Sequence, residues 1–158
     1  MCSFKNESLV RPEVNNVIDA VEVALLDRFQ RQECDVNHSF FEYLYVRECV
    51  LEVGMRVTSK IHKHRHPYVI MEGEAEVWVD GIGWKLIKGP YYGVTEAGTR
   101  RVLKIIQTCF WLTFHGHPLG DSKDLDDIEA YVIEPHQNEF MCTIPSQQIE
   151  RQCQDKSE

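Results

Sequence analysis

The chain has 158 residues, of which 43% are hydrophobic and 27% charged, with only 9 glycines and 6 prolines. This length and composition predict a single globular domain over residues 1–158 and exclude a disordered chain, a collagen or a coiled coil. The formal net charge of −8 argues against general nucleic-acid binding, because phosphate contacts need a positive surface. No apolar run approaches the length of a membrane span, so we expect no membrane contact.

The termini and the cysteines indicate a cellular location. The N-terminal sequence MCSFKNESLV lacks the basic and then apolar layout of a signal peptide, so we expect a cytoplasmic protein. Six cysteines are scattered along the chain without any C-x-x-C pair. We therefore predict six reduced thiols, with Cys49 and Cys109 in the core because both lie in apolar runs.

Charge is distributed unevenly along the chain. Residues 1–53 carry five basic and ten acidic side chains, residues 54–117 carry nine and five, and residues 118–158 carry three and ten. A basic middle between acidic flanks predicts a region that attracts anions. The alternative is that these lysines and arginines are solvated on the outer faces of strands.

The first predicted element is a helix over residues 12–31, with Pro12 in its first turn. Apolar residues recur at intervals of three and four, namely Val14, Val17, Ile18, Val21, Leu25 and Phe29. Asp19, Glu22 and Arg28 fall off this stripe. The simplest interpretation is a helix that covers a sheet.

Strands are predicted over residues 40–117. Short β-branched and aromatic runs alternate there with turn residues, a texture typical of a sandwich or a small barrel. The run VWVDGIGWKL predicts a hairpin with Asp80 and Gly81 in its loop. The sequence leaves open which face of FWLTFH, residues 110–115, looks into the barrel.

Beyond the strands, DSKDLDDIEAYVI predicts a short helix over residues 121–133, with Asp121 or Ser122 as its N-cap. Residues 134–158 are polar apart from FMCTIP. We expect the end of this tail, QQIERQCQDKSE, to be mobile or to fold on a partner.

Residues that carry chemistry are concentrated between Lys60 and His66, where the sequence reads KIHKHRH. Side chains two positions apart on a strand share a face, so an unbroken strand would point Lys60, His62, His64 and His66 the same way. Imidazoles in this arrangement can bind a metal ion or transfer protons near neutral pH. The alternative is an exposed basic edge strand.

This segment resembles the first motif of the cupin superfamily, G-x5-H-x-H-x3-E-x6-G. The matching positions are Gly54, Lys60, His62, His66 and Gly73, followed by the cupin-like strand GEAEVWV. The resemblance implies a mainly β fold, a single cupin-type double-sheet β-barrel of the jelly-roll kind. The two predicted helices add an N-terminal helix and a short C-terminal helix.

The second cupin motif matches only at Gly98, with Glu96 in place of a proline. The resemblance places the four usual metal-ligand positions at Lys60, His62, His66 and Arg101. Two of these are permanent cations, which repel a divalent ion at the centre that they would share. We therefore expect no cofactor.

A narrower resemblance is to small single-domain cupin-like proteins encoded by bacteriophages. Its segments here are Lys60/His62/His66, Pro90-Tyr91, Gly98-Thr99-Arg100-Arg101, Trp111/Thr113/His115 and Asp124-Leu125-Ile128-Glu129. This resemblance implies a protein of a phage-infected bacterium.

A pocket built from these residues suits a small anion. The predicted donors and proton carriers are Lys60, His62, His66, Arg101 and His115. Trp111 and Tyr92 offer rings for stacking, and His62 and His66 are the candidate catalytic residues. Because free imidazole titrates near pH 6.5, we expect affinity to fall as pH rises from about 5.5 to 8.

Three functions remain open. The first is a barrel that binds a small anionic ligand, phosphorylated or nucleotide-like, and sequesters it or acts on it; the phage resemblance implies counter-defence. The second is a metal-dependent oxygenase, isomerase or hydrolase. Its divalent transition metal would lie on His62, His66 and one further ligand from His64, His115, Glu72 or Glu76. The third is a structural or adaptor protein, and the terminal helices favour a homodimer.

Overall fold

The structure is a computed structural model that describes residues 12–79, 82–135 and 141–145. Its elements in chain order are α1 (Pro12–Leu26), β1 (Phe29–Arg31), β2 (Asp35–Phe41), β3 (Leu44–Leu51), β4 (Arg56–Thr58), β5 (His66–Val79), β6 (Gly83–Lys88), β7 (Tyr91–Thr95), β8 (Val102–Gly116), α2 (Leu125–Val132) and β9 (Met141–Pro145). The predicted mainly β fold, with one helix toward each end of the chain, is confirmed.

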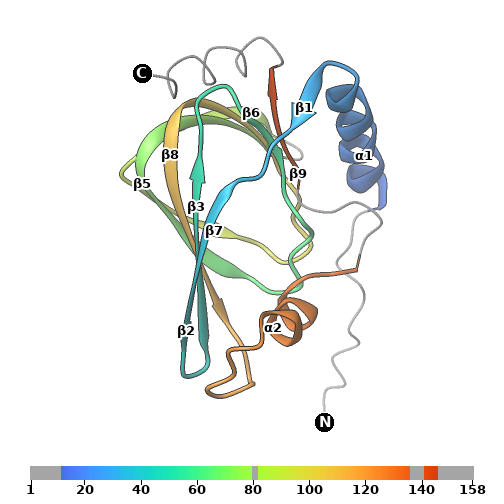
Figure 1. Cartoon of the computed structure of the whole chain (residues 1–158). Helices are drawn as coiled ribbons and strands as arrows, with labels where there is room; N and C mark the ends of the chain where they lie inside the picture. The colour runs from blue at the N-terminus through green and yellow to red at the C-terminus, as the bar shows by residue number, and fades with distance from the viewer. Residues whose placement is uncertain (1–11, 80–81, 136–140, 146–158) are drawn as a thin grey trace.

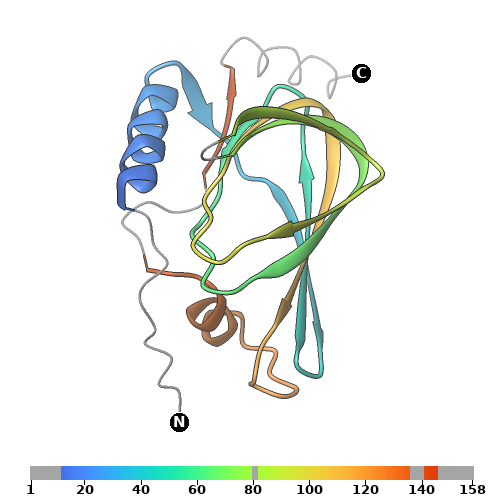
Figure 2. The same cartoon turned by 180° about the vertical axis from the view of Figure 1, so that it is seen from behind.

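The strands form one sheet that curls into a barrel (Figures 1 and 2). Neighbours follow the order β1-β9-β4-β8-β3-β2, while β5 pairs with β8, and β6 and β7 pair with β5. β5 forms the predicted hairpin with β6, with Val79 opposite Gly83. The register between β5 and β8 shifts around Gly73, which has φ of 101° and no room for a Cβ against the backbone of Thr108 and Cys109. Glycine is therefore required where the long strand bends.

The main core fills the inside of the barrel. Alternation along the strands buries residues such as Ile70 and Val77 of β5, and the core includes Cys49 and Cys109 as predicted. Residues at these positions point inward because successive side chains of a strand face opposite sides. The barrel wall therefore presents a continuous apolar inner surface.

Helix α2 lies at one end of the barrel (Figure 1). Its Ile128 and Val132 pack on Tyr45 of β3 in a second, smaller apolar cluster. The helix begins later than predicted, because Asp124 is its N-cap and accepts hydrogen bonds from two backbone N–H groups of the first turn. Neither helix in the described part of the chain is long and apolar enough to cross a membrane.

The N-terminal helix is shorter than the predicted range of 12–31. α1 ends at Leu26, and the chain then enters β1, whose Phe29 pairs with Pro145 of β9. The prediction is wrong over the last turn, because pairing with a strand from the far end of the sequence outweighs the local preference for helix.

The face of α1 that meets the barrel is partly charged. Ile18 is fully buried, but Val17, predicted on the same stripe, is 53% exposed. The guanidinium of Arg100 donates hydrogen bonds to Asp19 at 2.5 Å and to the buried Glu22 at 2.7 Å. The two acids that the sequence placed off the apolar stripe therefore anchor the helix to the barrel.

Strand β9 lies within the segment predicted to be a polar tail. It pairs with both β1 and β4, with Cys142 opposite Val57. The apolar side chains of Cys142 and Ile144 are buried in the sheet, so residues 141–145, part of the FMCTIP exception to the predicted polar tail, form a strand of the barrel. Residues 136–140 and 146–158, including the end expected to be mobile, lie outside the described residues.

Cys34 and Cys142 form a disulfide between the start of β2 and β9. The prediction of six reduced thiols is wrong for this pair, whose members are 108 residues apart and meet only in the folded chain. Cys49 and Cys109 are free and buried. The covalent link ties the strand nearest the C-terminus to the other wall of the barrel.

Replacing Arg100 by Met should lower the free energy of unfolding by about 3–5 kcal/mol, because Glu22 would remain buried without its cation. Urea unfolding measures this loss. Arg65→Met is the matched control, since Arg65 forms an exposed ion pair with Glu96 that should contribute less than about 1 kcal/mol. Equal losses in the two variants would contradict an anchoring role for Arg100.

Reduction of the Cys34–Cys142 disulfide should lower the free energy of unfolding by about 2–5 kcal/mol, because a long loop is released in the unfolded chain. Unfolding curves with and without reductant measure the difference. Alkylation of the unfolded, unreduced chain should spare Cys34 and Cys142, and peptide mapping should find them joined. Alkylation of either cysteine without reductant would show that the pairing is wrong.

Candidate functional site

The segment between Lys60 and His66 is irregular, and β5 begins only at His66. The backbone of this segment pairs instead with the last residue of α2 and with a residue that follows it. Lys63 donates its N–H to the carbonyl of Val132, and Glu134 donates to the carbonyl of Ile61, each at 2.9 Å. The expected alternation, and with it the alternative of an exposed edge strand, is therefore wrong for these residues.

Two of the four side chains expected on one face contact α2. The ammonium group of Lys60 donates a hydrogen bond to Glu129 of α2 at 3.0 Å. His64 is exposed and its ring stacks on Tyr131, with 4.6 Å between ring centroids. His64 is therefore not a member of the site.

The other two histidines meet a third, His115 of β8. One ligand nitrogen from each of His62, His66 and His115 lies within 4.8 Å of the others. The ring centroids of His62 and His66 are 4.4 Å apart, and those of His66 and His115 are 4.2 Å apart. We call these three residues the histidine cluster.

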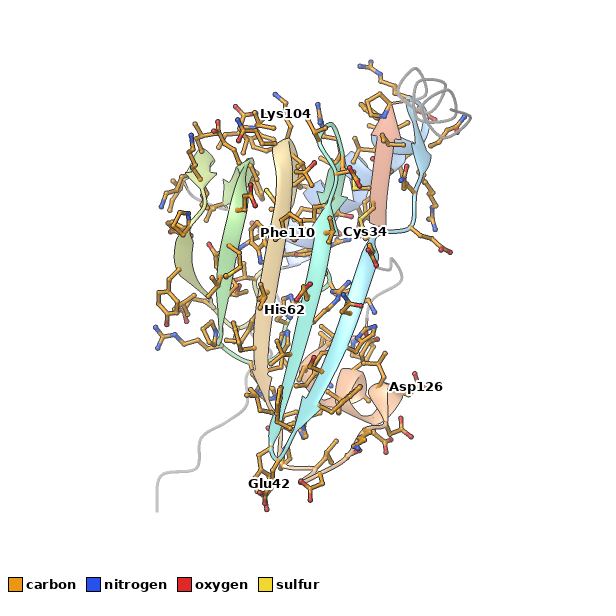
Figure 3. The ribbon with its side chains drawn as sticks, turned by 60° about the vertical axis from the view of Figure 1, so that its left-hand side comes forward. Cys34, Glu42, His62, Lys104, Phe110 and Asp126 are labelled. Carbon is orange, nitrogen blue, oxygen red and sulfur yellow. A yellow bond between two sulfur atoms is a disulfide. The ribbon has the colours of Figure 1, made fainter. Side chains whose placement is uncertain are left out.

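Pairing of β8 with β3 settles which face of FWLTFH looks inward. Trp111 and His115 are buried, and Thr113 lines the internal cavity described below. Phe110 lies on the opposite face and is 39% exposed (Figure 3). The face that carries Trp111, Thr113 and His115 is therefore the inner one.

Burial favours the neutral form of the three rings. Desolvation lowers the pKa of His62 and His66, and it lowers the pKa of His115 to about 3. The Nδ1 atom of His66 donates to the carbonyl oxygen of His64 at 3.2 Å, while Nδ1 of His62 is buried without a hydrogen-bond partner. These shifts reduce the part that ring protonation plays in anion binding between pH 5.5 and 8, and the expected fall of affinity over that range stays a prediction.

A cavity of about 80 Å³ adjoins the cluster. Its polar lining consists of Arg47, Ser59, Lys60, His62, His66, Thr95, Arg101 and Thr113. Its apolar lining consists of Cys49, Leu51, Val57, Leu103 and Trp111. Three of these lining residues are cations and none is a carboxylate. The ionisable lining is thus cationic although the whole chain has a net charge of −8.

Arg101 is held at the cavity without a carboxylate partner among the described residues. Its Nη2 donates to the carbonyl of Val94 at 3.3 Å, and its Cζ lies 4.8 Å from the centroid of the Tyr68 ring. Tyr68 in turn stacks on Trp111 and faces Gly93, where a Cβ would collide with the phenol. The Nε of Arg101 is buried and lacks an acceptor.

Arg47 of β3 lines the cavity and was missed in the sequence. The signal was available, because Arg47 occupies an inward position between Tyr45 and Cys49 in the strand LYVRECVL. A charged residue among buried positions indicates a partner or a ligand. Without the register of β3, this arginine could not be told from one on the solvent face.

The remaining predicted residues lie away from the site. Tyr92 is 67% exposed on β7, so it offers no ring to the cavity. Glu72 is exposed, and Glu76 forms an ion pair with Lys104 at 2.9 Å. Neither glutamate belongs to the histidine cluster.

No family model matches the sequence, and no curated protein matches it. Several solved structures, however, are similar to the structure of this chain. Ectoine synthase from P. lautus superposes with a TM-score of 0.50 at 13% identity, over 64% of this chain and 76% of that one. A double-stranded β-helix protein from Klebsiella pneumoniae has a TM-score of 0.49 at 13% identity, over 58% of this chain and 78% of that one. A cupin family protein from Methanocaldococcus jannaschii has a TM-score of 0.47 at 10% identity, over 56% of this chain and 87% of that one. The chain has the cupin-type double-stranded β-helix fold that its first motif predicted.

Proposed function

We propose that this chain binds a small anionic molecule in the cavity beside the histidine cluster. The observation that carries the proposal is the lining, which includes the cations of Arg47, Lys60 and Arg101, above all the buried Arg101 Nε that lacks an acceptor. An acidic protein that gathers cations around an internal space lowers the electrostatic free energy of an anion placed there.

Arg101 is the proposed principal contact. A buried N–H without an acceptor costs free energy that a ligand oxygen recovers, and the Nε of Arg101 is such a group. Tyr68 holds the guanidinium from one side, so little side-chain entropy is lost when the ligand binds. Arg47 and Lys60 add positive charge, although Lys60 is shared with Glu129.

The remaining candidate side chains surround the same space. His62 and His66 supply ring nitrogens that can donate to the ligand or move a proton, which makes them the proposed catalytic residues if the ligand is transformed. Trp111 supplies an apolar surface, and Thr113 a hydroxyl group. A barrel with only a structural role would have no use for this combination.

A second candidate function is supported by the histidine cluster, which we propose as a site for a divalent transition metal. Metal–nitrogen bonds of about 2.0–2.1 Å set the ligand atoms roughly 3.0–3.4 Å apart, so the rings need to approach from separations of up to 4.8 Å. The unpartnered, buried Nδ1 of His62 and the neutral state of the rings fit a metal ion. Bound there, it would act as a Lewis acid on an oxygen of the anion.

Among the third ligands considered, the geometry supports His115. His64 stacks on Tyr131 outside the cluster, and Glu72 and Glu76 are on the outer surface. Lys60, which was expected to repel a metal, is paired with the carboxylate of Glu129. This carboxylate offsets the charge of Lys60 and lowers its repulsion of a divalent ion.

Replacing Arg101 by Gln should weaken the binding of small anions by at least about tenfold, because one charge-assisted hydrogen bond contributes about 1.5–3 kcal/mol. Calorimetric titration with acetate, isobutyrate, inorganic phosphate and AMP measures this effect. Arg65→Gln, on the exposed surface, is the control and should bind as the wild type does. If none of the four anions binds, or if all bind equally to both variants, the proposal is wrong.

Metal-free protein should bind Co²⁺ with visible absorption bands typical of imidazole ligation. His66→Ala and His115→Ala should each weaken this binding by at least about tenfold, since each removes one ligand. His64→Ala is the matched control and should retain wild-type affinity. Loss of binding in His64→Ala equal to that in His66→Ala would rule out the cluster as the metal site.

A further inference from the structure

The walls of the cavity differ in chemistry from one part to another. All five apolar lining residues, namely Cys49, Leu51, Val57, Leu103 and Trp111, also belong to the main core of the barrel. This part of the cavity is therefore an extension of the hydrophobic core. Any ligand group placed against it is removed from water without gaining hydrogen bonds.

The change from apolar to polar lining follows the strand register. Cys49 pairs with Trp111, and one step further along the inner face Arg47 pairs with Thr113. The next inward pair brings His115 opposite Tyr45. Moving along β3 and β8, the lining thus passes from core residues to a cation and a hydroxyl, and then to the histidine cluster.

The charge available to a ligand is limited. Lys60 is engaged by Glu129, the Nη2 of Arg101 by the carbonyl of Val94, and the third lining cation, Arg47, is not free either. Among the three cations, Arg101 has a buried donor, its Nε, that lacks an acceptor. This supply suits a single negative charge, whereas a phosphate needs donors for several oxygens.

The size of the cavity favours small ligands. One water needs about 10–15 Å³ on this measure, so a cavity of about 80 Å³ takes the place of about five to eight waters. A molecule with a similar number of non-hydrogen atoms fits within it, whereas a nucleotide would extend beyond it.

We infer that the ligand is a small monocarboxylate with a branched or ring-shaped apolar group. Its carboxylate lies at Arg101, near the histidine cluster, and its apolar group lies against Leu51, Val57 and Leu103. This inference rests on the proposed function, since it names the class of anion that the same cavity takes.

Calorimetric titration of the whole chain with acetate, propionate, isobutyrate and isovalerate tests the inference. Affinity should rise about fourfold with each added carbon that is buried. Isobutyramide, which has the shape of isobutyrate without its charge, should bind at least about tenfold more weakly. Inorganic phosphate and AMP should bind more weakly than isobutyrate.

Leu103→Ala enlarges the apolar end of the cavity. It should shift the preference toward longer acids, so that benzoate gains affinity relative to isobutyrate. Val57→Ala, on the neighbouring strand and paired with Leu103, is the second variant if the first fails to fold by circular dichroism. If Leu103→Ala only loosened the packing, it would lower stability without raising the affinity for benzoate relative to isobutyrate.

The outcomes separate the inference from the proposed function. The inference would be overturned if the affinities were equal along the acid series. It would also be overturned if phosphate or AMP bound more tightly than every carboxylate. In both cases the Arg101-dependent anion site would stand. Absence of binding by all of these anions would overturn both. A rising series with an Arg101-dependent carboxylate preference supports both.

Discussion

Side-chain alternation along β8 is the constraint on which the candidate site depends. β8 pairs with β3, β4 and β5, so its register is fixed on both sides along most of its length. Leu103, Trp111 and His115 all face inward from this one strand, and Arg101 stands just before it. A slip of one residue would turn every one of the strand's side chains to the opposite face and remove the apolar wall and the third histidine together.

Two consecutive arginines at the start of this strand show how a buried charge is used in different ways. Arg100 is almost completely buried and is neutralised by Asp19 and Glu22, so its charge holds α1 in place. Arg101 is supported by a ring and a carbonyl, neither of which neutralises it. The first arrangement is satisfied within the chain, whereas the second still attracts an anion. Neighbouring residues of the same type thus serve architecture and binding.

The sequence predicted the fold through features that are local. The spacing from Gly54 to Gly73 marks a bend and two inward histidines, and both are set by a short stretch of chain. His115 was also named, because alternation along one strand is visible without the fold. The homodimer, the cytoplasmic location and the link to phages stay predictions.

Features that depend on distant segments were missed or misread. Lys60 forms an ion pair with Glu129, 69 residues away in the sequence, and Cys34 is bonded to Cys142 across 108 residues. Glu22 was placed off the apolar stripe of the predicted helix, yet it is buried against Arg100. In each case the partner lies far away in the sequence, and local residue spacing carries no information about contacts between such distant segments.

The position of β9 between β1 and β4 has a consequence for how the barrel is assembled. Among the described elements, α1 and β1 precede the rest, yet β1 has no described strand to pair with until residues 141–145 have been made. α1 lacks its charged anchor until Arg100 follows. The sheet therefore cannot grow from the N-terminus as synthesis proceeds. Closure of this wall is a late event that joins the two ends of the described chain, and contacts of such long sequence separation slow the search for the native state.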